Sequence, residues 1–284
     1  MTQIAAFTFL MAAITLSTPL VLAALGGYLS ERGGVVNIAL EGNMVVATVF
    51  GALASVASGN PIVGLAAAIG AACVLSLVHF ALTQVFRVEQ VISGMACNLL
   101  ALGVANITDR LSSISGGHKV VGLPVQAFVV AALVIPFVLD LASNHTRFGV
   151  RLLASGGDPD KARQMGVEPL KVRLAALLGT GALCGLAGAF MISNVGIYTE
   201  GMTANRGYIA LAALIVGGWK PVRALVACLV FGFFEALQVQ MQGVPLLGMQ
   251  LPREVWLSLP YLATVAALAS FMMKGRAPAG LGKV

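Results

Sequence analysis

The sequence is dominated by about nine apolar runs separated by short polar segments. An apolar stretch of about 20 residues is long enough to cross a bilayer as a helix. In lipid, only helices and closed barrels satisfy their own backbone polar groups. The runs therefore predict an all-α fold, a polytopic transmembrane helical bundle of about 8–10 spans, some of them broken, that forms a single domain over residues 1–284. The runs lie at about 4–29, 38–57, 62–86, 90–107, 124–143, 172–194, 206–219, 224–243 and 254–273.

The distribution of Lys and Arg predicts the orientation of these spans. If the polar segment 144–173 is cytoplasmic, nine spans place thirteen cations inside and four outside, and the outer four are Arg110, Lys119, Arg206 and Arg253. Such a bias follows the positive-inside rule and predicts a cytoplasmic C-terminus. The N-terminus is then outside, unless the segment near Gly33 is re-entrant. The net charge of +6 therefore indicates contact with anionic membrane lipids and not with nucleic acid.

The segment 144–173 is the only long polar stretch in the chain, with six Lys/Arg against three acidic residues. It predicts a cytoplasmic helix of about two turns. Asp158 is a good N-cap, Pro159 suits the first helical position and Gly166 can end the helix in the left-handed conformation. Two interpretations remain open for this segment. Either the helix docks on a soluble partner, or the segment is a solvated loop that only sets topology.

Residues 30–44 place polar groups within reach of the bilayer. The pair Gly33-Gly34 breaks the helix, and Asn37, Glu41 and Asn43 follow. Asn37 and Glu41 are four residues apart, so we expect them to share one helix face. Broken helices at membrane depth often line a substrate path. The alternative is that Glu41 lies near the interface and that the glycines only allow close helix packing.

A second interrupted segment, 201–221, holds a run too short for a comfortable crossing. Two such segments in the two halves point to an internal repeat with a pathway between the halves. Glu235 lies inside a predicted span, where an ionisable residue is costly unless it is paired, protonated or hydrated. His79 and Asn98 are expected to bond between helices, with Asn98 a weaker pathway candidate. The four cysteines are interpreted as small core residues, since no spacing indicates a disulfide or a metal site.

Several stretches resemble one family. They are ERGGVVNIALEGNM, RLLASGGDPDKARQMGV with the Gly/Ala-rich run after it, GMTANRGYIALAALIVGGWKP and ALVACLVFGFFEAL. Together they resemble permease subunits of ABC importers in the branched-chain amino acid, ribose and simple-sugar group. They are most similar to the nucleoside-type permeases that work with basic-membrane-protein-like binding lipoproteins. The resemblance covers most of the chain in the expected order.

The resemblance implies a subunit in a bacterial plasma (inner) membrane that pairs with a second homologous permease. It also implies a periplasmic or lipid-anchored binding protein, and purine nucleosides or related purine compounds as substrates. No phosphate-binding loop occurs, so this chain is not expected to be an enzyme, and a separate ATPase subunit should hydrolyse ATP. No metal or cofactor is expected. The ATPase would dock on the helix formed by Asp158, Pro159, Asp160, Lys161, Arg163 and Gly166.

The pathway candidates are Asn37, Glu41, Asn43 and Asn98, whose amide and carboxylate groups suit ribose hydroxyls and base edges. One alternative is a simple-sugar permease of the ribose type. The other, from a different class, is an ion-coupled secondary transporter, for which Glu41 and Glu235 are thin support.

Overall fold

The computed structural model describes residues 2–242, 253–271 and 277–283. Within them the chain is helical, apart from turns and one isolated bridge between Lys119 and Ile197, which confirms the all-α fold. The helices are α1 (Thr2–Arg32), α2 (Leu40–Ser58), α3 (Pro61–Phe80), the π-helix η1 (Ala81–Val85), α4 (Gln90–Ser112), α5 (Val125–His145), α6 (Arg147–Gly157), α7 (Pro159–Gln164), α8 (Pro169–Val195), α9 (Arg206–Val216), α10 (Pro221–Met241) and α11 (Arg253–Phe271).

Proline marks the first turn of four helices, α3, α7, α8 and α10, at Pro61, Pro159, Pro169 and Pro221. Proline suits this position because its missing N–H would have no partner there in any case. The polar residue before it adds a cap in α3 and in α7. The starts of these helices can therefore be recognised from the residues immediately around them in the sequence.

Seven described helices are long and apolar enough to cross a membrane: α1 from Phe7 onward, α2, α3 with η1, α4, α5, α8 and α10. Helix α11 coincides with most of the ninth predicted run, 254–273. The run predicted at 206–219 forms only the 11-residue helix α9. At 1.5 Å per residue, α9 is about 16 Å long, roughly half of the hydrocarbon thickness.

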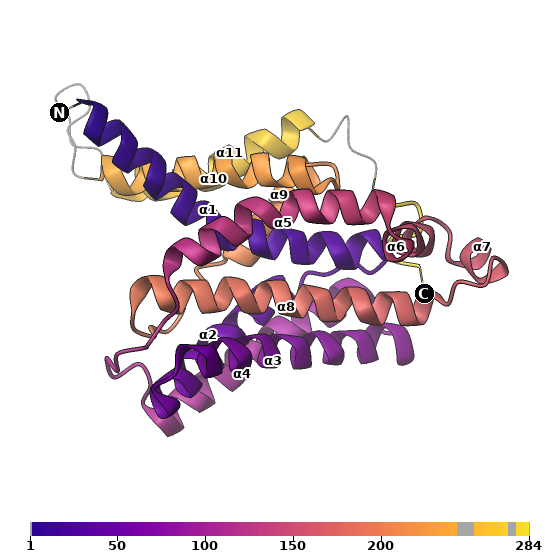
Figure 1. Cartoon of the computed structure of the whole chain (residues 1–284), viewed down its shortest axis with the longest axis horizontal. Helices are drawn as coiled ribbons and strands as arrows, with labels where there is room; N and C mark the ends of the chain where they lie inside the picture. The colour runs from indigo at the N-terminus through magenta and orange to yellow at the C-terminus, as the bar shows by residue number, and fades with distance from the viewer. Residues whose placement is uncertain (1, 243–252, 272–276, 284) are drawn as a thin grey trace.

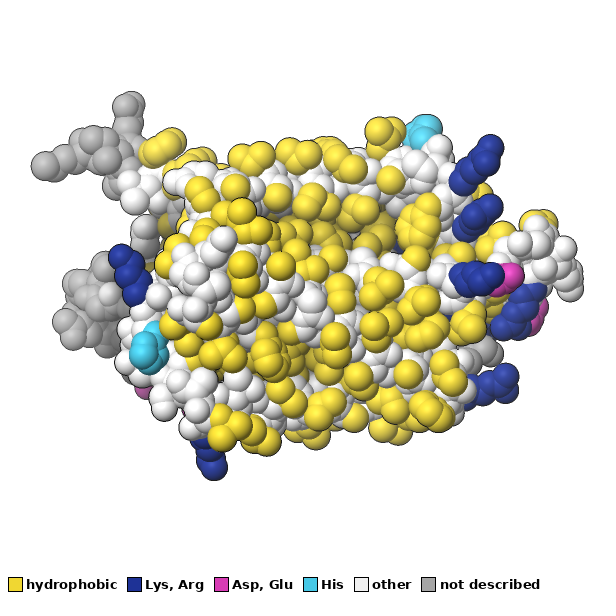
Figure 2. Space-filling view, turned by 60° about the horizontal axis from the view of Figure 1, so that its bottom comes forward, with side chains coloured by type: hydrophobic (Ala, Val, Ile, Leu, Met, Phe, Trp, Pro, Cys, Tyr) yellow, Lys and Arg dark blue, Asp and Glu magenta, His cyan; other side chains and the backbone are white. Residues whose placement is uncertain are grey.

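The long helices lie side by side along the long axis of the molecule (Figure 1). Helices α6 and α7 and the C-terminus lie at one end, here called the α6/α7 end, and the N-terminus lies at the other. In Figure 2 most of the Lys and Arg side chains on the visible face gather at the α6/α7 end, and apolar side chains cover the band between the ends. This separation is what a bilayer-spanning bundle requires.

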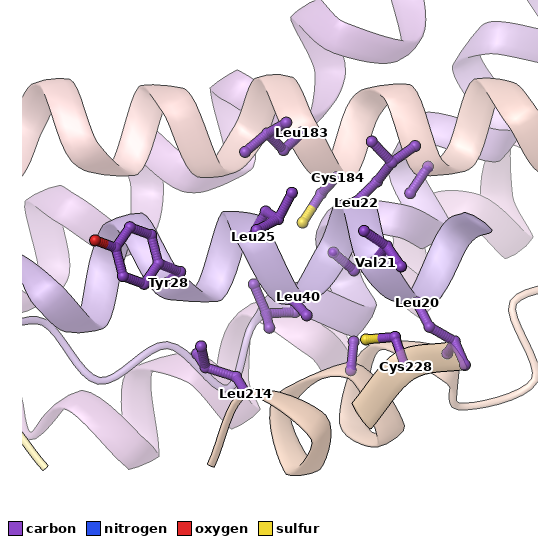
Figure 3. Close-up of a cluster of buried hydrophobic side chains, with 14 of the residues drawn as sticks. Leu20, Val21, Leu22, Leu25, Tyr28, Leu40, Leu183, Cys184, Leu214 and Cys228 are labelled. Atoms are coloured by element: carbon purple, nitrogen blue, oxygen red, sulfur yellow. The ribbon is translucent and has the colours of Figure 1, made fainter. Parts of the chain in front are cut away.

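Helix α1 occupies the middle of the bundle and packs against α8, α9 and α10. Its side chains Leu22 and Leu25 lie near Leu183 and Cys184 of α8 (Figure 3). All four cysteines are free, and three of them are buried. Their predicted role as small core residues is confirmed for Cys97, Cys184 and Cys228, while Cys73 is only partly covered.

The two halves of the bundle repeat one arrangement in opposite directions. Helix α1 runs toward the α6/α7 end and is followed by a break and the helix α2, whereas α8 starts at that end and is followed by a break and α9. The packing repeats as well, because α1 contacts α9 and α10 while α8 contacts α2 and α3. Helices α1–α4 and α8–α11 thus form an inverted repeat, joined by α5, α6 and α7. Inverted repeats with broken helices are a common architecture of transporters.

Candidate translocation and coupling site

The break between α1 and α2 covers residues 33–39 and is held by side chains of other helices. Gly34 has a φ of 97°, a conformation that favours glycine. The N–H of Val36 donates to Gln90 Oε1 at 2.6 Å, and His79 Nε2 lies 3.1 Å from the Val36 oxygen. The predicted break at Gly33-Gly34 is confirmed. Side chains satisfy its backbone polar groups, as non-helical backbone at membrane depth requires.

Asn37 lies inside this break and not on a helix. Its Oδ1 accepts the N–H of Ala39 at 3.0 Å, which leads the chain into α2 at Leu40. The expectation that Asn37 and Glu41 share a helix face is therefore wrong. The break is longer than the two glycines indicate, because bonds to the side chains of Gln90, His79 and Asn37 hold residues 36–39 outside a regular helix up to the start of α2.

Asn98 of α4 fastens the start of α2 in place. Its Oδ1 accepts the N–H of Gly42 at 2.8 Å, and its Nδ2 donates to the Ile38 oxygen at 3.0 Å and to the Tyr208 hydroxyl at 2.9 Å. One amide side chain thus joins α4, α2 and α9. The predicted interhelical bonding role of Asn98 is confirmed.

Glu41, in the first turn of α2, binds the N-terminus of α9. Its carboxylate accepts the N–H of Asn205 at 3.1 Å and the N–H of Gly207 at 2.6 Å. A negative group is favourable there because the first N–H groups of a helix are unpaired and its dipole is positive. A Cβ on Gly207 would lie 2.4 Å from the Glu41 nitrogen, so the two backbones touch. The starts of α2 and α9 therefore meet at one buried carboxylate. These two helices are called half-helices below because each follows a break in the chain, although α2 is long enough to be a span.

Beside this contact lies an ion pair that the sequence did not reveal. Arg206, counted above among the outer cations, lies within the bundle and pairs with Glu235 of α10. Its side chain is 19% exposed and that of Glu235 is 16% exposed. Pairing between the two residues offsets the free-energy cost of placing the ionisable Glu235 inside a span. The sequence signal was only the presence of one acid and one base in neighbouring apolar segments.

The four pathway candidates are all buried within this chain. Asn37 and Asn43 are 0% exposed, Asn98 is 5% and Glu41 is 7%. Neither amide atom of Asn43 has a hydrogen-bond partner in the described part of the chain. Three of these residues hold the half-helices, as described above, and Asn43 is a polar side chain in their midst without a bonding role.

The polar segment 144–173 folds into two helices. The short one, α7, is capped as predicted: Asp158 Oδ1 accepts the N–H of Lys161 at 3.1 Å, Pro159 is its first residue, and Gly166 follows it with a φ of 77°. This bond lowers the pKa of the exposed Asp158 carboxyl. Asp160 and Arg163 pair on its surface at 3.2 Å.

The preceding helix, α6, was not predicted. Thr146 caps it, with Oγ1 accepting the N–H of Gly149 at 3.1 Å. Its buried face is made by Gly149, Leu152 and Ser155, at a helical spacing that the sequence does contain. The many charged residues around this spacing had favoured a loop.

Helix α6 is bonded to the break after α1. The oxygen of Gly33 accepts bonds from Ser155 Oγ at 3.1 Å and from Nε of the buried Arg173 at 3.2 Å. A Cβ on Gly156 would lie 2.0 Å from the Arg32 oxygen, so backbone touches backbone here as well. From the sequence, Arg173 is only one of the six cations of the polar segment 144–173. Its place at the start of an apolar run was the signal for a buried role.

Residues 277–283 contact both α6 and the break after α1. The N–H of Gly280 donates to Gly156 at 2.8 Å, and that of Gly282 donates to Gly34 at 3.1 Å. Arg173 donates to the Lys283 oxygen at 2.8 Å. The C-terminal segment therefore ties α6, α8 and the first break together at the α6/α7 end.

Comparison with known proteins identifies the class of this arrangement. The family described as "Branched-chain amino acid transport system / permease component" matches residues 9–268. The guanosine ABC transporter permease protein NupQ of Bacillus subtilis is 33% identical over 300 residues, which cover 95% of this chain and 94% of that protein. The nucleoside ABC transporter permease protein NupC of Lactococcus lactis subsp. cremoris is 32% identical, over 92% and 91%. The ribose import permease protein RbsC of Escherichia coli is 24% identical, over 66% and 63%. No solved structure matches the chain.

Proposed function

Because this chain belongs to the family of branched-chain amino acid transport system permease components, we propose that it is a permease subunit of an ATP-driven importer for purine nucleosides or related purine compounds. The observation that carries the proposal is the meeting of the half-helices α2 and α9 at Glu41, in a chain that also bears the capped helix α7. Relatives named for guanosine and for nucleosides match over nine tenths of the chain, at 33% and 32% identity, and the ribose permease matches over less. A putative glucose permease of Haloferax volcanii also matches over nine tenths of the chain, at 31% identity. We place purine nucleosides before simple sugars because two of these three long matches are named for nucleosides.

The importer contains three kinds of partner in this proposal. A second homologous permease completes the pathway, a separate ATPase subunit hydrolyses ATP, and a periplasmic or lipid-anchored binding protein delivers the substrate. The clustering of Lys and Arg at the α6/α7 end supports a cytoplasmic position for that end and for the C-terminus. The protein is then a multi-pass component of the bacterial plasma membrane.

Helix α7 is the proposed docking surface for the ATPase. Its side chains Asp160, Lys161 and Arg163 are exposed, and Asp158, Pro159 and Gly166 set its two ends. A displacement of α7 moves α6, which is bonded to Gly33 in the break after α1. The break leads directly into α2, and Glu41 of α2 holds α9. This chain of contacts supports a transmission route from the ATPase to the junction of the half-helices.

The residues Asn37, Glu41, Asn43 and Asn98 become accessible to the pathway when this junction opens. All four are buried here, where the starts of α2 and α9 are in contact. The unpartnered amide of Asn43 supports this assignment, since a buried polar group without a bond is costly in a single static state.

Purification in mild detergent with mass spectrometry of the partners tests the assembly. Recovery of an ATPase subunit and a second permease is expected. In the reconstituted complex, Asp160→Ala with Arg163→Ala should abolish ATP-dependent guanosine uptake without loss of membrane insertion. The matched control is Glu168→Ala with Lys171→Ala, which removes an equally exposed pair just outside α7. Equal uptake by both double variants would contradict the docking assignment.

The ion-coupled alternative is tested on the same preparation. Uptake that survives removal of ATP but stops when the proton gradient is collapsed favours a secondary transporter, and the opposite pattern favours the importer. A stable chain that transports alone, without an ATPase subunit, also contradicts the proposal.

A further inference from the structure

A small niche of mixed lining lies beside α4, on the far side of the half-helix junction from α6 and α7. It is a cavity of about 160 Å³, formed by α2, α4 and the segment 198–203 that leads toward α9. Apolar side chains such as Val45, Leu102 and Met202 line it together with the polar residues Thr48, Asn106, Tyr198, Glu200 and Thr203. Asn106 and Glu200 are exposed.

The niche continues to the half-helix junction along two helix faces. On α4, Asn98, Leu102 and Asn106 recur every four residues and therefore lie on one face. On α2, Thr48 lies seven residues after Glu41, which is also the same face. Tyr208 of α9 lies at the end of this line that is nearest the half-helix junction. It is 41% exposed, and its hydroxyl accepts the hydrogen bond from Asn98.

This face carries exposed polar groups beside the exposed Leu102, unlike the apolar faces of other helices. Helices α3 and α5 expose large aliphatic side chains such as Val74, Val130 and Val134, which suit lipid. Exposed amide and carboxylate groups inside a membrane domain are costly in lipid and normally face water or a partner. The line from Glu200 through Asn106 to Tyr208 therefore faces water or a partner and not lipid.

We propose that Tyr208, Asn106 and Glu200 form this chain's wall of the translocation pathway and contact the purine nucleoside. The purine base stacks on the exposed ring of Tyr208, which Asn98 holds in place. The ribose hydroxyls bond the amide of Asn106 and the carboxylate of Glu200. This assignment rests on the proposed function, and it names residues outside the buried set of pathway candidates.

The size of the niche suits a pathway that the proposed second permease completes. Small-molecule pockets usually measure about 300–1,000 Å³, and the niche is smaller than that. It can enclose only part of a nucleoside, and in the proposed assembly the second permease supplies the opposite wall.

Thiol labelling in the assembled importer tests the wall without reference to the substrate. Single cysteines are introduced as Tyr208→Cys and Asn106→Cys in a chain whose own cysteines are replaced, and a charged methanethiosulfonate reagent that reacts only in water is added. Val74→Cys and Val130→Cys are the lipid-facing controls. Labelling at 208 and 106 but not at 74 and 130 is expected. Failure to label 208 and 106 would overturn the assignment.

The substrate contact is tested on the same complex. Added guanosine should slow labelling at position 208, and Tyr208→Ala should raise the KM for guanosine about tenfold or more, the size expected for loss of a base–aromatic stack. Tyr208→Phe, which keeps the ring, should leave KM near that of the wild type. A wild-type complex that imports guanosine while Tyr208→Ala leaves KM unchanged overturns the stacking contact. A labelled wall in a complex that imports no nucleoside overturns the proposed function and supports the wall.

Discussion

Replacing Glu41 by glutamine removes the charge that joins α2 to α9 while keeping the size of the side chain. The carboxylate is 7% exposed and accepts two N–H bonds, at 3.1 Å from Asn205 and at 2.6 Å from Gly207. A hydrogen bond to a charged group contributes about 1.5–3 kcal/mol. Glutamine offers one acceptor and turns an NH₂ group toward the second N–H. We therefore expect Glu41→Gln to lower the free energy of unfolding by about 1.5–3 kcal/mol, and Glu41→Ala by about 3–6 kcal/mol.

The free energy of unfolding is measured by titrating the purified protein in mixed micelles with SDS. Amide hydrogen exchange of residues 204–216 reports the local effect, which is faster exchange at the start of α9. The control is Glu200→Gln, which removes an exposed carboxylate from the segment just before α9. If both Glu41 variants lose less than about 0.5 kcal/mol, the usual limit for a surface substitution, and exchange in α9 is unchanged, the carboxylate does not hold the two helices together.

Three further predictions concern the α6/α7 end and the first break. Gly34→Ala should cost about 1–2 kcal/mol of stability at its positive φ and impair uptake, whereas Gly59→Ala, also at positive φ but with open space around it, should affect stability alone. Gly156→Ala should abolish ATP-coupled uptake, because its Cβ would lie 2.0 Å from the last carbonyl oxygen of α1, while Gly157→Ala, in open space, should retain uptake. The pKa of Asp158 is lowered by the N–H bond at the start of α7. The stabilisation of α7 by the Asp158 carboxylate is therefore complete above the unfolded pKa of about 4. It is lost only as pH falls through the lower pKa of the folded state. The protection factors of the α7 amides, which correct for the intrinsic pH dependence of exchange, should stay constant from neutral pH down to about pH 5 and fall below about pH 4.

The long helices could be predicted because a bilayer selects them by apolar length and composition. The runs at 62–86, 90–107 and 172–194 correspond to α3 with η1, α4 and α8. The ends of α7 were also predictable, since capping depends on the residues next to the helix. Both kinds of information lie within a few residues of the element that they define.

The contacts between distant segments could not be predicted in this way. Glu41 binds α9 across more than 160 residues of sequence, and Arg173 reaches Gly33 across 140. A charged residue in an apolar run shows that a partner is required but not which residue supplies it. The pairing of Arg206 could not be predicted for this reason: its position before a short run identified it only as one of the outer cations, whereas the structure pairs it with Glu235 within the bundle.

The first break is bonded to two groups of elements that need not move together. On one side, Ser155 of α6 bonds Gly33, and the C-terminal segment bonds Gly34. On the other side, His79 of α3 and Gln90 of α4 bond Val36. A displacement of α6 relative to α3 and α4 must therefore lengthen one set of bonds, because only residues 34 and 35 separate Gly33 from Val36. An extended residue spans at most about 3.6 Å, so this short link transmits a displacement of a few ångströms without absorbing it. The next rigid element along the chain is α2, and α2 carries the carboxylate that holds α9. A transport cycle driven at α7 needs two states that differ in these contacts, and the break after α1 is the place where such a difference reaches both half-helices at once.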